Sequence, residues 1–351
     1  MESLARLIDA NLNRSREALR TIEDVSRFHL GNQGFAQRAK DLRHELVHVV
    51  TNVKGLNQAV LIAWRDVEGD VGTVLSAQGE YQRESLFQIG AAAGARLSEA
   101  LRAIEEALKA CNQGQVASKQ VEAIRYKSYT LDQAVCLSLG TGLVKQWRLC
   151  VLITESLCVH RTWEEVARES IAGGADCLQL REKNLDGGEL LARARVLVEI
   201  ASQAAQRPSV IINDRVDIAL LCGADGVHLG QGDLGVQDGR RLCGQRLLIG
   251  VSTESMEQAE RAWMNGADYC GVGPMFTTNT KHKPRLAGPE YARQYVQTAH
   301  ARPHLAIGGI NAENCTQLVA AGVKGIAVSS WICSAKNPQS ECERLVLSMG
   351  G

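Results

Sequence analysis

Hydrophobic residues in the first part of the chain recur at intervals of three and four, the spacing of one face of an amphipathic α-helix. Two such faces are formed by Ala18, Leu19, Ile22 and Val25, and by Leu97, Leu101, Ile104 and Leu108. Proline, which interrupts helices, is absent from residues 1–146. We therefore predict an all-α domain over residues 1–145.

The predicted helical domain contains an internal repeat. The segment REALRTIED at residues 16–24 recurs as SEALRAIEE at residues 98–106, an offset of 82. At the same offset, Leu42-Arg43 matches Ile124-Arg125. Similarity at a fixed offset is typical of duplicated structural units. We expect one helical unit to pack against its copy.

A polar segment, WRDVEGDVGT at residues 64–73, separates the two copies and contains two glycines, so we do not expect it to continue a helix. A charged, turn-forming linker is one interpretation. The alternative is a ligand loop in which Arg65, Asp66 and Asp70 line a groove between the copies. This domain has no glycine-rich phosphate loop of the P-loop type, which favours an interaction or scaffold role over catalysis.

From Trp147 onward, short apolar runs alternate with helical segments, as strands and helices do in parallel α/β folds. Eight runs recur, at Leu149–Ile153, Cys177–Leu180, Val210–Ile212, Gly226–Leu229, Leu247–Val251, Tyr269–Val272, Leu305–Ile307 and Gly325–Val328. Eight strand and helix units predict an α/β fold, a (β/α)8 TIM barrel over residues 146–351. The loops that follow the strands should form its active face.

The tripeptide Gly-Ala-Asp precedes predicted strands at residues 174–176, 223–225 and 266–268, and Gly322-Val-Lys takes the equivalent place before the eighth. Glycine just past a helix permits the left-handed backbone that ends it. We interpret these segments as structural turns at the end of the barrel opposite the active loops.

Two aspartates follow the ends of neighbouring predicted strands. Asp214 comes after Asn213 at the end of the third strand, and Asp233 follows the fourth. The carboxyl ends of parallel strands lie on one edge of a sheet, so Asp214 and Asp233 should meet there. Mg²⁺ takes one or two protein carboxylates and completes its coordination with waters and substrate phosphates. The pair is a candidate magnesium site, and a chance pair of loop aspartates is the alternative.

The second strand ends in the segment QLREK, residues 179–183. Side chains alternate along a strand, so Gln179, Arg181 and Lys183 should share one face while Leu180 and Glu182 take the other. Two cations and an amide at the barrel mouth predict a site for an anion and a heterocycle. A surface strand with salt-bridged side chains is the alternative.

The later loops of the predicted mouth are rich in hydroxyl groups and glycine. The loop containing Thr278-Asn279-Thr280-Lys281 is interpreted as a lid that brings hydroxyls and an ammonium group to phosphate oxygens, and a plain solvated loop is the alternative. Gly309 and Ser329-Ser330 follow the seventh and eighth strands, where such barrels usually bind phosphate. Ser252 adds a hydroxyl after the fifth strand, whereas we expect His228 to be buried and hydrogen bonded.

Composition narrows the partners and the compartment. A formal net charge of zero argues against a nucleic-acid partner, because such proteins normally carry a basic excess. None of the eleven cysteines forms a C-x-x-C pair, which favours reduced thiols over disulfides or zinc. We find neither a signal peptide nor an apolar run long enough to span a bilayer. We predict a cytoplasmic protein that binds neither nucleic acid nor membrane.

Along residues 147–335 the motifs resemble, in order and spacing, those of the thiamine phosphate synthase family. They are QLREK, IINDR, GVHLGQ-x-D, IGVS, the GVGPMF-x-T-x-TK loop, IGGI and VSS. The resemblance is specific because other phosphate-binding barrels share IGGI and the serine pair but not QLREK together with the lid. It implies that the chain joins hydroxymethylpyrimidine diphosphate to a thiazole phosphate and releases diphosphate with the help of Mg²⁺.

The resemblance also implies roles for individual residues. The pyrimidine diphosphate would be held by Gln179, Leu180, Arg181, Glu182, Lys183, Asn213, Ser252 and Lys281, the metal by Asp214 and Asp233, and the thiazole phosphate by Thr278, Asn279, Thr280, Gly309, Ser329 and Ser330. Arg181, Lys183 and Lys281 would be catalytic, because cations can neutralise a departing diphosphate. Thr277 and Glu254 depart from the family pattern, and we expect changed lid stiffness rather than lost activity.

Alternative functions stay open at this stage. A thiazole tautomerase of the same barrel family would rearrange the thiazole without using the diphosphate. The intact QLREK segment argues against this alternative. A non-catalytic scaffold would bind phosphate without turnover. The helical domain resembles the extension of some bacterial, including cyanobacterial, thiamine phosphate synthases, and a related module has been linked to hydroxymethylpyrimidine phosphate kinase activity. The sequence is compatible with a homo-oligomer, and with either the plain or the carboxylated thiazole phosphate as substrate.

Overall fold

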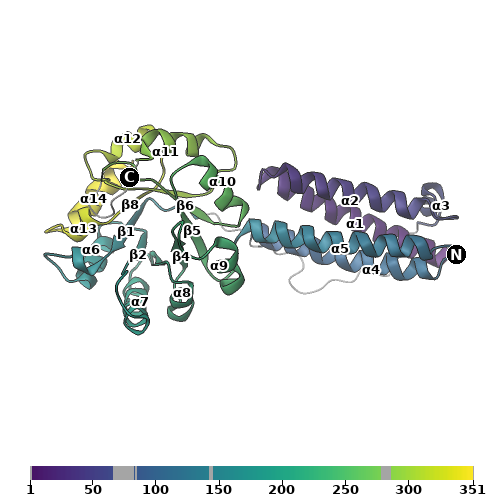
Figure 1. Cartoon of the computed structure of the whole chain (residues 1–351), viewed down its shortest axis with the longest axis horizontal. Coiled ribbons are helices and arrows are strands. Elements are labelled where there is room, and N and C mark those ends of the chain that lie inside the picture. Colours follow the sequence, from purple (N-terminus) through teal and green to yellow (C-terminus); the bar gives the residue numbers. More distant parts are fainter. Residues whose placement is uncertain (1, 66–82, 84, 142–144, 278–285, 351) are drawn as a thin grey trace. The chain divides into compact units, whose positions relative to one another are not determined.

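The computed structural model describes residues 2–65, 83, 85–141, 145–277 and 286–350 (Figure 1). The chain divides into two compact units, one ending at residue 142 and the other beginning at residue 143. The first unit is helical and the second is a closed barrel, which confirms the predicted fold class. Most of the polar segment 64–73 and all of the lid residues 278–281 lie outside the described residues.

The described helices of the first unit are α1 (Glu2–Phe28), α2 (Gln33–Thr51), α3 (Gln58–Ala63), α4 (Leu86–Lys109) and α5 (Gln115–Leu139). Side-chain oxygens of Asn32, Asn57 and Ser85 accept hydrogen bonds from the first turns of α2, α3 and α4, which fixes where these helices begin. Helix α1 packs against α2 and α4, and α5 packs against α2 and α4. The four long helices therefore enclose one hydrophobic core, to which Leu19 and Leu101 belong.

The pairs α1–α2 and α4–α5 are the two copies of the sequence repeat. An ion pair to a buried glutamate is repeated with them: Arg43 Nη2 lies 3.0 Å from Glu23 Oε2, and Arg125 Nη2 lies 3.1 Å from Glu105 Oε2. Glu23 and Glu105 are both buried, and a buried charge requires a partner. The two ion pairs occupy equivalent positions in the repeat, because Glu105 and Arg125 each lie 82 residues after Glu23 and Arg43.

The second unit is a barrel of parallel strands that pair in sequence order, and β8 pairs with β1 to close it. The strands are β1 (Leu149–Ile153), β2 (Cys177–Leu180), β3 (Ser209–Asn213), β4 (Gly226–Leu229), β5 (Leu248–Thr253), β6 (Tyr269–Val272), β7 (His304–Ile307) and β8 (Ile326–Val328). The described helices around them are η2 (Glu155–Leu157), α6 (Trp163–Ala172), α7 (Gly187–Ser202), α8 (Val216–Cys222), α9 (Val236–Cys243), α10 (Met256–Met264), α11 (Gly288–Gln297), α12 (Cys315–Ala320), α13 (Ser330–Cys333) and α14 (Pro338–Ser348).

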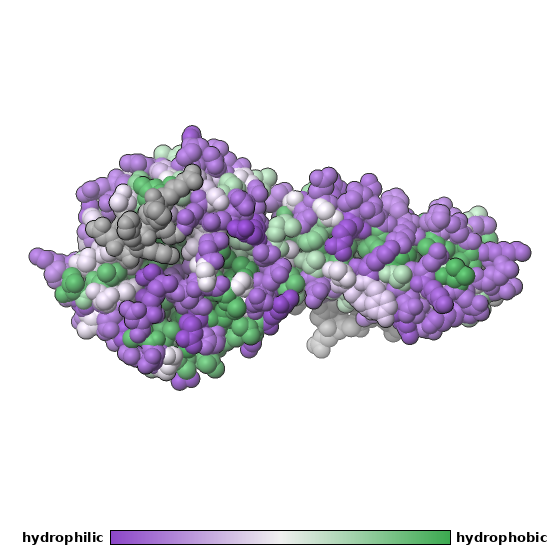
Figure 2. Space-filling view, viewed as in Figure 1, coloured by the Kyte–Doolittle hydropathy of each residue, from purple (hydrophilic) through white to green (hydrophobic). Residues whose placement is uncertain are grey.

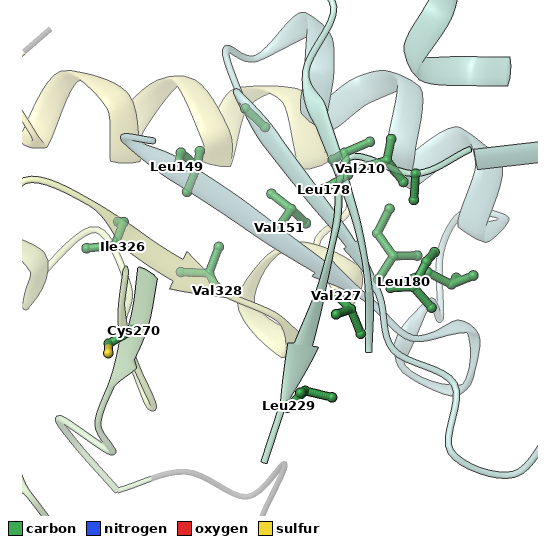
Figure 3. Close-up of a cluster of buried hydrophobic side chains, with 14 of the residues drawn as sticks. Leu149, Val151, Leu178, Leu180, Val210, Val227, Leu229, Cys270, Ile326 and Val328 are labelled. Carbon is green, nitrogen blue, oxygen red and sulfur yellow. The ribbon is translucent and has the colours of Figure 1, made fainter. Parts of the chain in front are cut away.

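Alternate residues of the strands belong to two different cores. Val151 and Leu178 belong to the larger core, together with residues of the surrounding helices (Figure 3). Their neighbours Cys150 and Cys177 belong to a smaller cluster that includes Tyr269. This division follows from the two-residue period of a strand. Cys150 and Cys177 are free thiols and pack as small hydrophobic side chains, as expected from the sequence.

The Gly-Ala-Asp turns connect neighbouring strands at their amino ends. Asp176 accepts a hydrogen bond from the Leu149 N–H at 3.0 Å, and Asp225 accepts one from the Val210 N–H at 2.7 Å. Asp268 does the same for the Ile249 N–H at 2.7 Å. Each aspartate therefore binds a backbone N–H near the start of the preceding strand. The structural role predicted for these repeated turns is thereby explained.

The face of the molecule drawn in Figure 2 is mainly hydrophilic, with hydrophobic residues in smaller areas. Exposed aromatic side chains of the helical unit include Tyr126 and Tyr129 on α5. Across the part of the chain that the structure describes, no helix combines the length and the apolar character needed to cross a membrane.

Candidate active site

A cavity of about 170 Å³ lies at the carboxyl ends of the barrel strands. Every strand, or the loop that follows it, contributes to its wall. The lining residues proposed from the sequence are Gln179, Arg181, Lys183, Asn213, Asp214, Asp233, Ser252, Gly309, Ser329 and Ser330. Parallel strands thus bring together residues that are far apart in the chain.

Strand β2 and the residues after it contribute Gln179, Arg181 and Lys183 to the cavity, in the expected alternation. Leu180 is fully buried in the larger hydrophobic core. Glu182 accepts hydrogen bonds from Arg193 Nη1 at 3.1 Å and from the Glu155 N–H at 2.7 Å. Leu180 and Glu182 are not among the residues that line this cavity, because alternation directs them to the opposite side of the strand.

Asp214 and Asp233 interact with each other at the cavity, and Lys183 Nζ donates a hydrogen bond to Asp214 Oδ2 at 3.0 Å. Burial raises the pKa of Asp214 above its usual value; the Lys183 ammonium opposes this change and the Asp233 carboxylate adds to it. Neighbouring carboxylates disfavour each other's charged form. One ammonium does not fully relieve that repulsion, so the pair is suited to a cation.

Backbone geometry fixes both aspartates. Asp214 has a φ of +63°, the left-handed region in which aspartate is enriched among non-glycine residues. Its N–H donates to the His228 carbonyl at 2.8 Å, which holds this conformation. Asp233 Oδ2 accepts a hydrogen bond from the Gly230 N–H at 2.7 Å, which closes a short turn after β4. The loop conformations therefore position the carboxylates before any ligand binds.

The donor set fits a magnesium ion. Within the described residues, no three His, Cys, Asp or Glu side chains gather as metal ligands. A cation at this position would therefore have the two aspartates as its protein carboxylates, and waters or substrate phosphates as its other ligands. This is the coordination that Mg²⁺ commonly adopts in phosphate-binding enzymes.

His228 lies within β4 and also lines the cavity. Its Nε2 is 3.0 Å from Ser252 Oγ and its Nδ1 is 3.2 Å from Tyr269 Oη. The hydrogen bonding expected from the sequence is present, but His228 is half-buried rather than buried, because it contributes to the cavity wall. The sequence shows that β4 contains a histidine; only the closed barrel shows which neighbours it meets.

The end of the cavity formed after β7 and β8 contains backbone suited to an anion. Gly308 and Gly309 have positive φ values of 105° and 64°. A Cβ on Gly309 would lie 2.4 Å from the Thr277 carbonyl oxygen, so only glycine fits there. Ser329 Oγ donates to the Leu152 carbonyl at 3.0 Å, which anchors the start of α13 next to β1.

The described residues include only the beginning of the predicted lid. Gly273 and Pro274, which begin this loop, line the cavity. The substrate contacts proposed for Thr278, Asn279, Thr280 and Lys281 lie outside the described residues, and so does the catalytic role of Lys281.

Comparison with known proteins shows the family to which the chain belongs. The thiamine monophosphate synthase family matches residues 149–332, and a curated thiamine-phosphate synthase from Thermosynechococcus vestitus is 36% identical over 99% of this chain and 96% of its own length. The chain belongs to the thiamine monophosphate synthase family. It is accordingly a transferase of thiamine biosynthesis that acts on small-molecule substrates.

Further relatives agree with this family. A thiamine-phosphate synthase from Gloeobacter violaceus is 38% identical over 95% of this chain and 93% of its own length. A solved structure, a thiamine phosphate pyrophosphorylase from Pyrococcus furiosus, is 32% identical, with a TM-score of 0.53. It covers 58% of this chain and 95% of its own chain. The helical unit has its own match, because the ThiD2 family matches residues 6–134.

Proposed function

We propose that this synthase condenses hydroxymethylpyrimidine diphosphate with thiazole phosphate by stabilising the departing diphosphate, with Arg181, Lys183 and Lys281 as the catalytic cations. The observation that carries the proposal is the contact of Lys183 with Asp214 in a cavity that Asp233 and Arg181 also line. Charges of both signs at one cavity can bind a diphosphate together with its counter-ion.

The metal would be Mg²⁺, held by Asp214 and Asp233. When bound, the ion would help to neutralise the charge that develops on the diphosphate. The protein supplies Lys183, whose ammonium already contacts Asp214. In the complex with substrate, we propose that this ammonium also donates hydrogen bonds to a phosphate oxygen.

The remaining groups position the two rings. Gln179, Asn213 and Ser252 would bind the pyrimidine, and Gly309, Ser329 and Ser330 would bind the thiazole phosphate. The electron-rich aminopyrimidine can carry the positive charge that is left on its methylene group, so no protein nucleophile is needed. The protein then contributes mainly by aligning the thiazole nitrogen with that carbon.

The test is diphosphate release by the purified chain given both substrates and Mg²⁺. We expect Asp214→Ala and Lys183→Ala each to lower kcat/KM by about a hundredfold, as loss of one charge-stabilising group does. Lys324→Ala is the matched control, because Lys324 is exposed near the amino end of β8 and does not line the cavity. Full activity of both single variants would reject the assigned roles. Magnesium-independent rearrangement of the thiazole phosphate alone would favour the tautomerase instead.

For the helical unit we propose a scaffold or regulatory role, with a hydroxymethylpyrimidine phosphate kinase as the second candidate. The four-helix arrangement supports a scaffold. The match to the ThiD2 family is the reason for retaining the kinase as the second candidate. ATP-dependent phosphorylation of hydroxymethylpyrimidine phosphate by the full chain would decide for the kinase.

We also propose a cytoplasmic location and a homo-oligomer. Size-exclusion chromatography with light scattering would measure the oligomeric state.

A further inference from the structure

A groove lies between α1 and α2, in the first copy of the helical repeat. It comprises a hollow of about 650 Å³ and an adjoining hollow of about 580 Å³, and Arg16, Arg43 and His44 line both. Figure 1 shows these two helices running side by side. The groove belongs to the helical unit alone and shares no residue with the barrel cavity.

The second copy of the repeat shows what the same backbone does with other side chains. At the offset of 82, Arg43 corresponds to Arg125, but His44 is replaced by Tyr126 and Val47 by Tyr129. The Arg125 guanidinium lies 4.9 Å and 5.6 Å from the centres of the two tyrosine rings. Its side chain is 10% exposed, against 19% for Arg43. Two aromatic rings therefore cover the arginine in the second copy, whereas the first copy leaves it open to the groove.

The cations of the groove differ in what they already bind. Arg43 is committed to Glu23 at 3.0 Å. Arg20, which lines the adjoining hollow, lies 3.4 Å from Glu23 and 3.3 Å from Asp24. Arg16 has no acidic partner within the described residues, and its hydrogen bond there is to Asn13 Oδ1 at 3.4 Å. Arg16 is the cation with spare hydrogen-bonding capacity, and its counterpart in the second copy is Ser98.

Among the residues that line the larger hollow, Glu45 is the acidic one, and it is already paired. Glu45 is bound by Lys127 at 2.8 Å. Glu17 lines only the adjoining hollow, which Arg16 and Arg20 also line. His44 and His48, four residues apart on α2, both line the larger hollow. The ring nitrogens of His48 lie 3.2 and 3.1 Å from Asn52 Nδ2 and are engaged there, whereas His44 can donate a ring N–H group into the hollow. A guanidinium presents several N–H donors in a planar fork that suits the oxygens of a phosphate group, and an imidazole N–H in the same hollow can add another.

We propose that this groove binds a small phosphate-bearing molecule, with Arg16 as the principal ligand, His44 as an additional donor and His48 in the wall of the same hollow. The second copy has lost or never acquired these groups and serves as support. The site is separate from the synthase cavity, so it does not depend on the mechanism proposed for the barrel.

The test is a titration of the full chain with inorganic phosphate, with its histidines labelled with carbon-13 and their ring signals followed by nuclear magnetic resonance. The signals of His44 and His48, assigned with His44→Gln and His48→Gln variants, report on this groove and not on the barrel. We expect a saturable shift of both signals at phosphate concentrations of about 1 mM or below. Arg16→Ser, which installs the residue of the second copy, should raise the apparent Kd at least about tenfold.

Arg14→Ser is the matched control, because Arg14 is exposed on the same helix and does not line the groove. Its titration curve should equal that of the unaltered chain. The proposal is overturned if phosphate causes no saturable shift, or if Arg16→Ser binds as well as the control. It is also overturned if zinc ions shift the two signals and phosphate does not, because the histidines would then form a metal site.

Discussion

At the scale of single residues, the active cavity depends on where side chains are missing as much as on where they are present. Gly250 on β5 is the clearest case, since a Cβ there would lie 2.0 Å from the Tyr269 ring and 2.4 Å from its hydroxyl oxygen. Tyr269 is fully buried and holds His228, which in turn contacts Ser252. The shape of this strand therefore determines the position of cavity groups on its neighbours.

We predict that Gly250→Ala displaces Tyr269, lowers the free energy of unfolding by about 1–3 kcal/mol and reduces the synthase rate. The physical reason is overpacking, because the added Cβ would overlap the buried Tyr269 ring. Urea unfolding and diphosphate release measure the two effects. Gly188→Ala is the control, since nothing lies within 4 Å of its added Cβ, and its stability should change by less than about 0.5 kcal/mol. Equal behaviour of the two variants would contradict this account.

The sequence predicted cavity residues well where one strand decides their direction. Gln179, Arg181 and Lys183 line the cavity because alternation along a strand is a local property. Leu180 and Glu182 were assigned to the substrate by family resemblance along a continuous motif, and alternation directs both away from it. The neighbours of His228 could not be predicted, because they come from β5 and β6 and depend on how the barrel closes.

At the scale of elements, the repeated ion pairs to the buried Glu23 and Glu105 connect the helices of each copy. Burial alone would raise the pKa of Glu105, but hydrogen bonds from Lys109 and Arg125 outweigh it and hold the pKa below its usual range. A carboxyl whose pKa is lower in the folded state stabilises the fold above its unfolded pKa. That stabilisation is lost as the pH falls through the folded pKa.

We predict that Glu105→Gln destabilises the helical unit by about 3 kcal/mol near neutral pH, because it leaves the nearly buried Arg125 without its carboxylate. The difference between this variant and the unaltered chain should shrink as the pH falls below about 4, the usual range of glutamate. Urea unfolding followed by far-ultraviolet circular dichroism measures both quantities. Glu106→Gln is the control: Glu106 also contacts Arg102 and Lys109 but is half-exposed, so its effect should be small.

The elements themselves were largely predictable from periodicity. All eight strands lie within one or two residues of the expected runs, because buried parallel strands are continuous apolar segments. The repeated ion pairs were not foreseen, although both members of each pair lie at the repeat offset. Their signal was available in the sequence as two matched acids and two matched arginines, but the packing of α1 on α2 is needed to connect them.

At the scale of the whole molecule, the barrel has a cavity and hydrophobic cores of its own. Among the residues that the structure describes, all those that line the cavity lie between Leu152 and Trp331. We predict that a chain of residues 146–351 folds and retains most of the full-length rate of diphosphate release. Steady-state kinetics and size-exclusion chromatography of both chains test this. Loss of the rate in a truncated barrel with intact circular dichroism would show that the helical unit takes part in synthesis.

The contact between Lys127 and Glu45, at 2.8 Å, joins two positions that are each other's counterparts in the repeat. In an assembly of two identical hairpins, this position would lie on the two-fold axis and face its own copy. A charged side chain at that position would face a side chain of the same charge and be repelled by it. A covalent tandem escapes that restriction, since one half can become acidic and the other basic. The same freedom allows one hairpin to specialise while its twin keeps the bundle folded.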